Sequence, residues 1–231
     1  MRDRPRSSQS IEQLIETQCR KWQVMGKEED KKKSALPCIT VSREPGSLGR
    51  QVAKELADQL GLDLFGGKII HEVAKSADMS ESVVESLDEK RRSFLNELVE
   101  TMERKRHLWD YEYLSHLTKV IRTIGEYGPA VLLGRGANFI LPPDKTFRIR
   151  VVAPLDVRIK NFADEFGVSK EEAEQHVKNV GSDRKAFIRK YFHADIADPI
   201  HYNLVINTKG LGVDAVVKII KTALDSRMVT R

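Results

Sequence analysis

The pattern of apolar and polar positions from residue 38 onward changes repeatedly between two periods. Short, continuous apolar runs predict buried strands, and longer stretches with an apolar residue every three or four positions predict amphipathic helices. The predicted strands are Cys38–Ser42, Leu62–Phe65, Ala130–Leu133, Phe147–Ala153 and Leu204–Asn207.

The segments between these strands have helical patterns. Val52, Leu56 and Leu60 recur at four-residue spacing, and Gly61 is placed to end that helix. Two more helices are expected to start near Pro154 and Ser169. Residues 68–127 contain only helical signals. The capping-box patterns are Ser86–Glu89 and Ser169–Glu172, and the closing helix carries Val213, Val216, Val217, Ile220 and Leu224.

Strands that alternate with helices predict an α/β fold with a parallel sheet covered on both faces. Two helical segments, 68–127 and 155–195, are longer than a simple crossover needs. We expect them to stand over the carboxyl ends of the strands, where such sheets bind ligands. This layout is typical of a kinase with closing lids, and the main domain is expected to span residues 37–226.

Residues 1–36 form a separate region by their pattern. Residues 8–25 carry an apolar stripe at helical spacing, and Lys27–Ser34 has the charge density of a solvated linker. Two interpretations of the helix stay open: it packs on its own domain, or it docks a partner or a second copy of the chain.

The turn Gly46–Gln51 carries the strongest chemical signal. A predicted strand leads through a Pro/Gly turn into a helix N-terminus, where unpaired backbone N–H groups and the helix dipole favour an anion such as phosphate. Gly46 and Gly49 let the backbone curl close to the anion. Ser47 can add a hydroxyl, and Arg50 can add a fork of donors.

This turn differs from a Walker A motif, which ends in Gly-Lys-Ser/Thr. Glu44 occupies the first glycine position, Arg50 the lysine position and Gln51 the Ser/Thr position, so the usual hydroxyl ligand for Mg²⁺ is missing. The turn alone leaves two interpretations open: a phosphate site, or an ordinary strand-to-helix turn whose glycines serve only backbone geometry.

Four stretches in matching order and spacing resemble the cytidylate-kinase-like family: residues 39–61, 131–141, 150–158 and 198–208. The resemblance covers residues 38–225. It implies a P-loop NTPase-type parallel sheet flanked by helices, with helical acceptor-binding and lid insertions at 68–127 and 155–195. It also implies ATP with Mg²⁺ as donor, and a nucleoside monophosphate, CMP or dCMP, as acceptor.

The resemblance also implies roles for individual residues. The turn residues Gly46, Ser47, Gly49, Arg50 and Gln51 would bind the donor phosphates. Arg135 would reach the acceptor phosphate, and Arg189 would assist it. Arg50 would act in catalysis with Arg158 and Arg184 on the lid, since phosphoryl transfer needs positive charge around the transferred group. Each arginine has a second interpretation. Arg135 could pair with a carboxylate, and Arg158, Arg184 and Arg189 could be exposed helix residues.

Several positions depart from the family pattern. Leu48 replaces a glycine of the turn, Gly66-Gly67 replaces an Asp-Ser pair near the acceptor, and Gly136 replaces an Asp that reads the cytosine. Val180-Gly181 replaces an Arg-Asp pair of the lid, and Leu133 leaves no Walker-B-like carboxylate for magnesium. These departures affect acceptor recognition, metal support and lid chemistry.

Composition excludes several other classes. The net charge of +5 is mild, and the sequence lacks the combination of basic and aromatic residues that is typical of a nucleic-acid-binding surface. The longest apolar runs are far too short to span a membrane, and the first ten residues do not resemble a signal peptide. The two cysteines and six histidines show no metal-ligand spacing, so we expect no protein-bound zinc and a cytoplasmic location.

Two functional hypotheses follow. The first is a nucleoside-monophosphate-kinase-like phosphotransferase that uses ATP. The second is a regulatory or interaction module of the same fold that binds nucleotides but has little catalytic activity.

Overall fold

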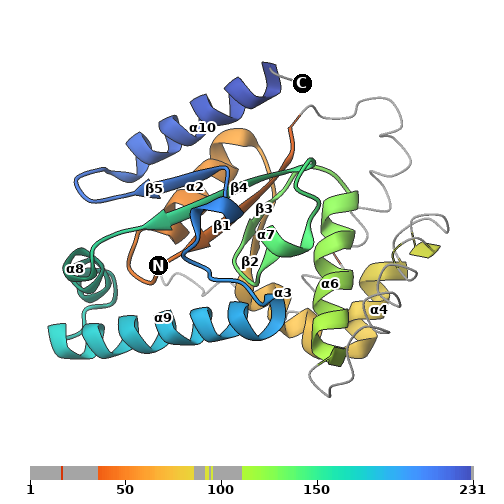
Figure 1. Ribbon diagram of the computed structural model, residues 1–231, viewed down its shortest axis with the longest axis horizontal. Coiled ribbons are helices and arrows are strands. Elements are labelled where there is room, and N and C mark those ends of the chain that lie inside the picture. The colour runs from red at the N-terminus through yellow and green to blue at the C-terminus, as the bar shows by residue number, and fades with distance from the viewer. Residues whose placement is uncertain (1–16, 18–35, 86–91, 94, 96–110, 230–231) are drawn as a thin grey trace, which may run out of the picture. The chain divides into compact units, whose positions relative to one another are not determined.

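The computed structural model describes residues 17, 36–85, 92–93, 95 and 111–229 (Figure 1). They fall into two compact units: residues 68–127 belong to one, and residues 34–67 with 128–231 belong to the other. The predicted linker Lys27–Ser34 and the capping box Ser86–Glu89 lie outside the described residues. Of the predicted helix 8–25, only Thr17 is described, and it is helical.

The larger unit contains a five-stranded parallel sheet, which confirms the predicted α/β fold. The strand order is β2-β3-β1-β4-β5. The strands are β1 (Cys38–Arg43), β2 (Leu64–Gly66), β3 (Val131–Leu133), β4 (Thr146–Val152) and β5 (Leu204–Asn207).

The second strand begins two residues later than the sequence pattern predicts. Gly61 ends the preceding helix in a left-handed conformation with φ 65°. The N–H of Leu62 then donates to the Ala57 carbonyl at 2.9 Å. Leu62 therefore completes the helix terminus and is not available to the sheet.

Helices connect the strands and cover the sheet. Ser169 caps the long helix that follows it with the predicted capping box. The short elements α7 and η2 were not predicted, because three or four residues are too few to show a helical period. The helices are α2 (Gly49–Leu60), α7 (Ala137–Ile140), α8 (Leu155–Phe166), α9 (Lys170–Phe192), the 3₁₀ helix η2 (Pro199–His201) and α10 (Val213–Val229).

The two faces of the sheet differ in polarity. The side chains of Ile39, Val41, Ile149 and Val151 alternate onto one face, where they join the apolar core with α2 and α10. The opposite face carries polar residues at the positions in between. There, β1 and β4 pair Ser42 with Arg150, and both side chains are buried. The alternation of apolar and polar residues along β1 and β4 therefore gives the sheet one apolar face and one polar face.

The smaller unit is helical in its described part, as its sequence pattern predicts. It contains α3 (Gly67–Lys75), α4 (Ala77–Glu85) and α6 (Tyr111–Glu126). The His71 ring lies 2.8 Å from the Tyr113 hydroxyl and links α3 to α6. In the described ranges, no helix of either unit is long and apolar enough to cross a membrane.

Candidate phosphate site

The turn between β1 and α2 places the helix N-terminus at the end of the sheet. Gly46 has φ 74°, and Leu48, directly before the helix, has φ 62°. The first backbone N–H groups of an α-helix have no intrahelical partner. In the described part of the chain, no side chain caps those of α2. These donors line a cavity together with Arg43, Arg50 and Arg184.

This first cavity, the loop cavity, has a volume of about 210 Å³. One wall is the turn from Arg43 to Gln51. The opposite wall belongs to α8 and α9 and includes Phe162 and His176, whose rings stack with centroids 4.4 Å apart. The cavity thus combines backbone and guanidinium donors on one side with an aromatic surface on the other.

The two glycines of the turn allow close packing against neighbouring elements. A Cβ atom at Gly46 would overlap the Arg158 carbonyl oxygen of α8, and one at Gly49 would lie only 2.5 Å from the Arg43 Cβ of β1. The Asn161 amide also donates to the Gly46 carbonyl at 2.9 Å. Backbone geometry and packing therefore already require glycine at positions 46 and 49. This agrees with the second interpretation left open by the sequence, an ordinary strand-to-helix turn whose glycines serve backbone geometry.

Ser47 and Gln51 have structural partners. The Ser47 hydroxyl is fully buried and lies within hydrogen-bond distance of the Glu44 and Val151 carbonyls. The Gln51 amide donates to Glu165 of α8 at 3.0 Å. The Ser47 backbone N–H also donates to the Glu44 carbonyl at 3.3 Å, so both polar donors of this residue have partners inside the protein. The side chain of Gln51 also borders the loop cavity.

The predicted arginines occupy different surroundings. Arg50 is exposed at the mouth of the loop cavity, and Arg184 of α9 donates to the Arg43 carbonyl at 2.8 Å. Arg158 of α8 donates to the Ala153 carbonyl at 2.9 Å. Arg189 is exposed on α9 and does not line the loop cavity.

Arg135 follows β3 with φ 54°. Its Nε donates to the Gly67 carbonyl at 3.1 Å, and its guanidinium lies 5.8 Å from the Phe187 ring centroid. Among the described residues, no carboxylate forms an ion pair with Arg135, so the carboxylate pairing considered from the sequence is not observed there. The side chain is held close to the end of the sheet by a carbonyl and a ring.

Three functional candidates were missed by the sequence reasoning: Arg43, Glu44 and Arg150. Glu44 accepts the Ala153 N–H at 3.2 Å and lies 3.4 Å from Arg158 Nε and 3.9 Å from Arg150 Nη2. The alternation of arginine with apolar residues in β4 could have identified Arg150. The position of Arg43 at the end of the central strand could have identified that residue, since ligands bind beyond the carboxyl ends of parallel strands.

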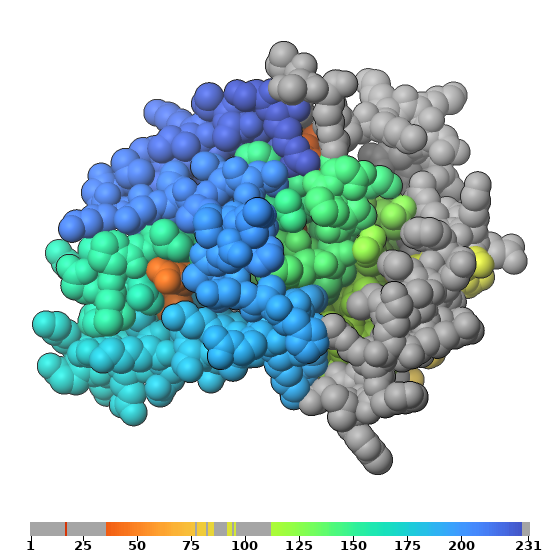
Figure 2. Space-filling model, in the orientation of Figure 1, coloured from red at the N-terminus to blue at the C-terminus, as the bar shows by residue number. Residues whose placement is uncertain are grey.

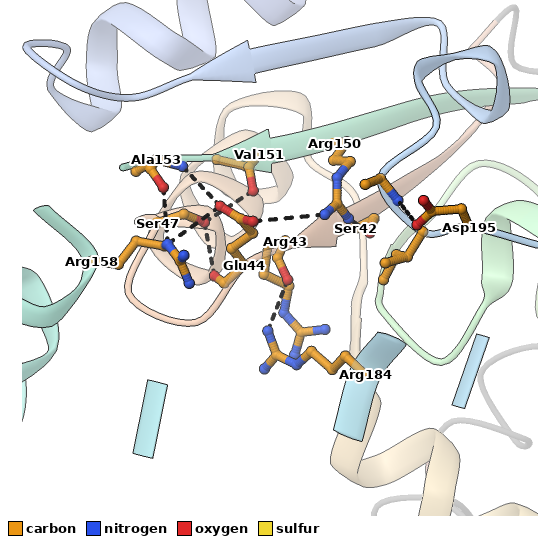
Figure 3. Close-up of polar contacts among 12 residues, drawn as sticks. Ser42, Arg43, Glu44, Ser47, Arg150, Val151, Ala153, Arg158, Arg184 and Asp195 are labelled. Carbon is orange, nitrogen blue, oxygen red and sulfur yellow. Dashed lines mark hydrogen bonds and ion pairs between the residues drawn. The ribbon is translucent and has the colours of Figure 1, made fainter. Parts of the chain in front are cut away.

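Figure 3 shows how the side chains of Arg43, Glu44, Arg150, Arg158 and Arg184 converge from β1 and its turn, β4, α8 and α9. They line a second cavity of about 260 Å³, the α9 chamber, which shares Arg43, Glu44, Pro45 and Arg184 with the loop cavity. In Figure 2, atoms coloured as β1 and its turn are visible in a hollow between α8, α9 and the blue segment before β5. The cationic residues of the chamber are Arg43, Arg150, Arg158, Lys178, Arg184 and Lys185.

The accumulated positive charge perturbs the arginines themselves. Burial, with the nearby Arg184, Arg135 and Arg50 guanidinium groups, lowers the pKa of Arg43 to about 9. Burial, with Arg135 and Arg150, lowers the pKa of Arg184 to about 10. Both shifts disfavour the charged form, and a bound anion would oppose them.

The donor set does not fit a protein-held magnesium ion. Magnesium prefers carboxylate and water oxygens. Glu44 is engaged by two arginines, the Ser47 hydroxyl is turned inward, and β3 ends in Leu133. Among the residues that the structure describes, there is no group of three or more metal-ligating side chains.

Fold and site together define an α/β domain of the P-loop kinase type, with helix N-terminal amides and clustered arginines at the end of its sheet. The chain belongs to the cytidylate kinase-like family, which it matches over residues 38–210. It is 27% identical to a cytidylate kinase from Ignicoccus hospitalis over 190 residues, which are 82% of this chain and 99% of that protein. It is 30% identical to a cytidylate kinase from Desulfurococcus amylolyticus over 190 residues, 81% of this chain and 92% of that protein.

Solved structures support the fold. An uncharacterized protein from Eubacterium ventriosum superposes with a TM-score of 0.62 at 22% identity, covering 82% of this chain and 99% of the other. A gluconokinase from Sinorhizobium meliloti superposes with a TM-score of 0.50 at 12% identity, covering 86% of this chain and 97% of the other. The chain is therefore a distant homologue of cytidylate kinases with the fold of P-loop kinases.

Proposed function

We propose that this protein is an ATP-dependent phosphotransferase that transfers the γ-phosphoryl group of ATP to a small acceptor. The observation that carries the proposal is the convergence of the uncapped α2 amides with Arg43, Arg50 and Arg184 in the loop cavity. These donors can bind the β- and γ-phosphates and stabilise the charge of the transferred group.

The predicted residues take the following roles in this proposal. The backbone of Gly46–Gln51 binds the donor phosphates, and the side chain of Arg50 reaches them from the cavity mouth. Arg158 and Arg184 bring charge from α8 and α9 to the transferred group. Arg135 and Arg189 are assigned to the acceptor, and the exposed position of Arg189 requires that it act from outside the two cavities.

Magnesium, in this proposal, arrives with ATP and is held by the phosphates and water. Such binding is common for this ion, which keeps several of its waters. The chain contributes guanidinium groups around the phosphates, and these can balance charge that other enzymes balance partly with carboxylate-bound metal.

CMP or dCMP is the acceptor that the family name suggests. Gly136, however, lies against the Phe192 ring, and a Cβ atom at position 136 would overlap that ring. The carboxylate that reads cytosine in the family pattern therefore has no room here without a shift of Phe192. An acceptor read by other contacts is consistent with this packing.

A coupled ADP-release assay with ATP·Mg²⁺ and a panel of nucleoside monophosphates tests the proposal. We expect turnover with one of them, and a loss of 10²-fold or more in kcat for Arg50→Ala and for Arg184→Ala. Lys54→Ala is the matched control, because Lys54 is exposed on α2 and lines neither cavity. Turnover that survives both arginine substitutions would refute the assignment.

Specific contacts favour the second candidate function, a nucleotide-binding module with little catalysis. The turn is bonded to α8 by Asn161 and Glu165, and Leu48 places a side chain where the family has glycine. Saturable ATP binding without turnover on any acceptor would support this candidate. Absence of both binding and turnover would exclude the two functions together.

A further inference from the structure

The turn before α2 is held by two side chains that reach its backbone from other elements. The Asn161 amide of α8 donates to the Gly46 carbonyl at 2.9 Å. The Thr208 hydroxyl, directly after β5, lies 3.2 Å from the Ser47 carbonyl. The two residues are 115 and 161 positions away from these partners in the sequence, so the fold alone brings them to the turn.

The hydroxyl of Thr208 has one proton to donate, and its surroundings favour the turn as the acceptor. The side chain is 3% exposed, and the hydroxyl also lies 3.4 Å from the Val152 carbonyl. That carbonyl already accepts the Thr208 N–H at 2.9 Å, whereas the Ser47 carbonyl has no other donor among the described residues. Without the hydroxyl, the Ser47 carbonyl would be left unsatisfied in a buried place.

Fixing a carbonyl also fixes the direction of the next N–H group. In a planar trans peptide unit, the C=O and N–H bonds point to opposite sides. Thr208 therefore directs the Leu48 N–H away from itself, and among the described residues this N–H has no acceptor. Leu48 lines the loop cavity together with the first residues of α2, whose amides are uncapped.

Asn161 has the same effect on the preceding peptide unit. Its bond to the Gly46 carbonyl directs the Ser47 N–H to the opposite side, where it donates to the Glu44 carbonyl at 3.3 Å. That bond closes the turn. Two successive peptide units are therefore oriented by side chains that do not line the loop cavity or the α9 chamber.

The conformation of Leu48 is a second sign that the turn is held from outside. A leucine at φ 62° is unfavourable, and such a residue persists only where its surroundings fix the backbone. The two carbonyls that precede it are the ones that Asn161 and Thr208 bind. These bonds supply the required constraint.

We propose that Asn161 and Thr208 are positioning residues, which keep the amides of the turn directed at bound nucleotide phosphates. This role rests on the proposed binding of nucleotide phosphates at the turn, which both candidate functions share. Neither residue touches the ligand. If the Ser47–Leu48 peptide unit rotated, the cavity would lose an N–H donor and gain a carbonyl oxygen, which repels an anion.

Isothermal titration calorimetry of the full chain with β,γ-imido ATP and Mg²⁺, well below the Tm of every variant, tests the role of Thr208. Thr208→Val keeps the shape of the side chain and removes the donor, so we expect the Kd to rise about tenfold or more. Thr208→Ser keeps the hydroxyl and loses the methyl group, and its Kd should stay within about threefold of the wild type. Thr222→Val is the matched control, because the Thr222 hydroxyl is exposed and donates to the Lys218 carbonyl within α10.

Asn161→Ala tests the second contact. Alanine is the best helix former, so the substitution itself does not weaken α8. We expect the Kd for β,γ-imido ATP to rise about fivefold or more, because the Gly46 carbonyl loses its donor. Asn179→Ala is the control, since Asn179 is exposed on α9 and lines neither cavity, and its Kd should equal that of the wild type.

The outcomes separate a positioning role from a structural one. A lower Tm in Thr208→Val and Asn161→Ala with unchanged nucleotide affinity would show bonds that only stabilise the fold, and would overturn the proposal. Equal losses of affinity in Thr208→Ser and Thr208→Val would assign the effect to packing and overturn it as well. In both cases nucleotide binding by the wild type, and with it the proposed function, would stand. A wild type that does not bind millimolar β,γ-imido ATP would refute the proposed function and the positioning role together.

Discussion

Glu44→Gln is the substitution that most directly tests the electrostatic account of the site. It removes one negative charge and keeps the size and one acceptor oxygen of the side chain. In the wild type, one carboxylate serves Arg158 at 3.4 Å, Arg150 at 3.9 Å and the Ala153 N–H at 3.2 Å. All three partners are largely buried, with side-chain exposures of 15% for Arg158 and 4% for Arg150.

The magnitude follows from the distances and the burial. At an effective dielectric constant of 20, each pair attracts with about 4 kcal/mol before desolvation is counted. Removing one partner of a fully buried pair costs about 3–5 kcal/mol, whereas exposed pairs contribute about 0–1 kcal/mol. Glu44 is 24% exposed and therefore lies between these limits. We expect Glu44→Gln to lower the free energy of unfolding by about 2 kcal/mol.

Urea denaturation followed by circular dichroism measures this difference. Asp164→Asn is the control, because Asp164 is exposed on α8 and should change stability by less than about 0.5 kcal/mol. Glu44→Ala should cost about 1 kcal/mol more than Glu44→Gln, since the Ala153 N–H also loses its acceptor. A Glu44→Gln protein as stable as the wild type would show that the carboxylate does not organise the arginines.

Four further predictions concern other parts of the larger unit. Leu48→Gly should raise the free energy of unfolding by up to about 1 kcal/mol in urea denaturation, because glycine adopts φ 62° without the cost that a leucine bears; a loss of stability would contradict this. Ser169→Ala should lower it by about 1 kcal/mol through loss of the α9 cap, and Ser169→Asp should restore most of that loss. Gly136→Asp should cost about 2 kcal/mol, and less in a Phe192→Ala background, because the new side chain meets that ring; additive costs would refute the contact. Affinity for β,γ-imido ATP measured by calorimetry should fall as the pH rises from 8 to 10.5, because the lowered pKa of Arg43, about 9, makes the loop cavity lose positive charge while the phosphates keep their own; a constant affinity would exclude Arg43 from the site.

The sheet and most helices could be predicted because they depend on local apolar patterns. All five strands were found in the right order along the chain, and the Ser169 capping box was predicted to the residue. The start of β2 could not be predicted from periodicity. Leu62 looks like a strand residue, but the left-handed Gly61 directs its N–H back to the helix.

The candidate site could be predicted only in part, because its contacts join distant segments. The turn was expected from its motif and Arg184 from the family resemblance, and the structure brings them to one cavity. Glu44 was interpreted only as a missing glycine. Its partners, Arg150 and Arg158, are more than 100 positions away, and no local pattern shows that these groups meet.

The positions at which this turn departs from a Walker A loop are linked by charge. The turn has Glu44 where a Walker A loop has glycine, and it has no hydroxyl for magnesium at Gln51. A carboxylate so close to bound phosphates would repel them if it remained free. Two arginines neutralise it, and the same arginines line the chamber, so the carboxylate orients cations and does not oppose the anion. An anionic ligand that binds these unbalanced guanidinium groups beside the turn would stabilise the folded protein, whether the ligand is transferred or only bound.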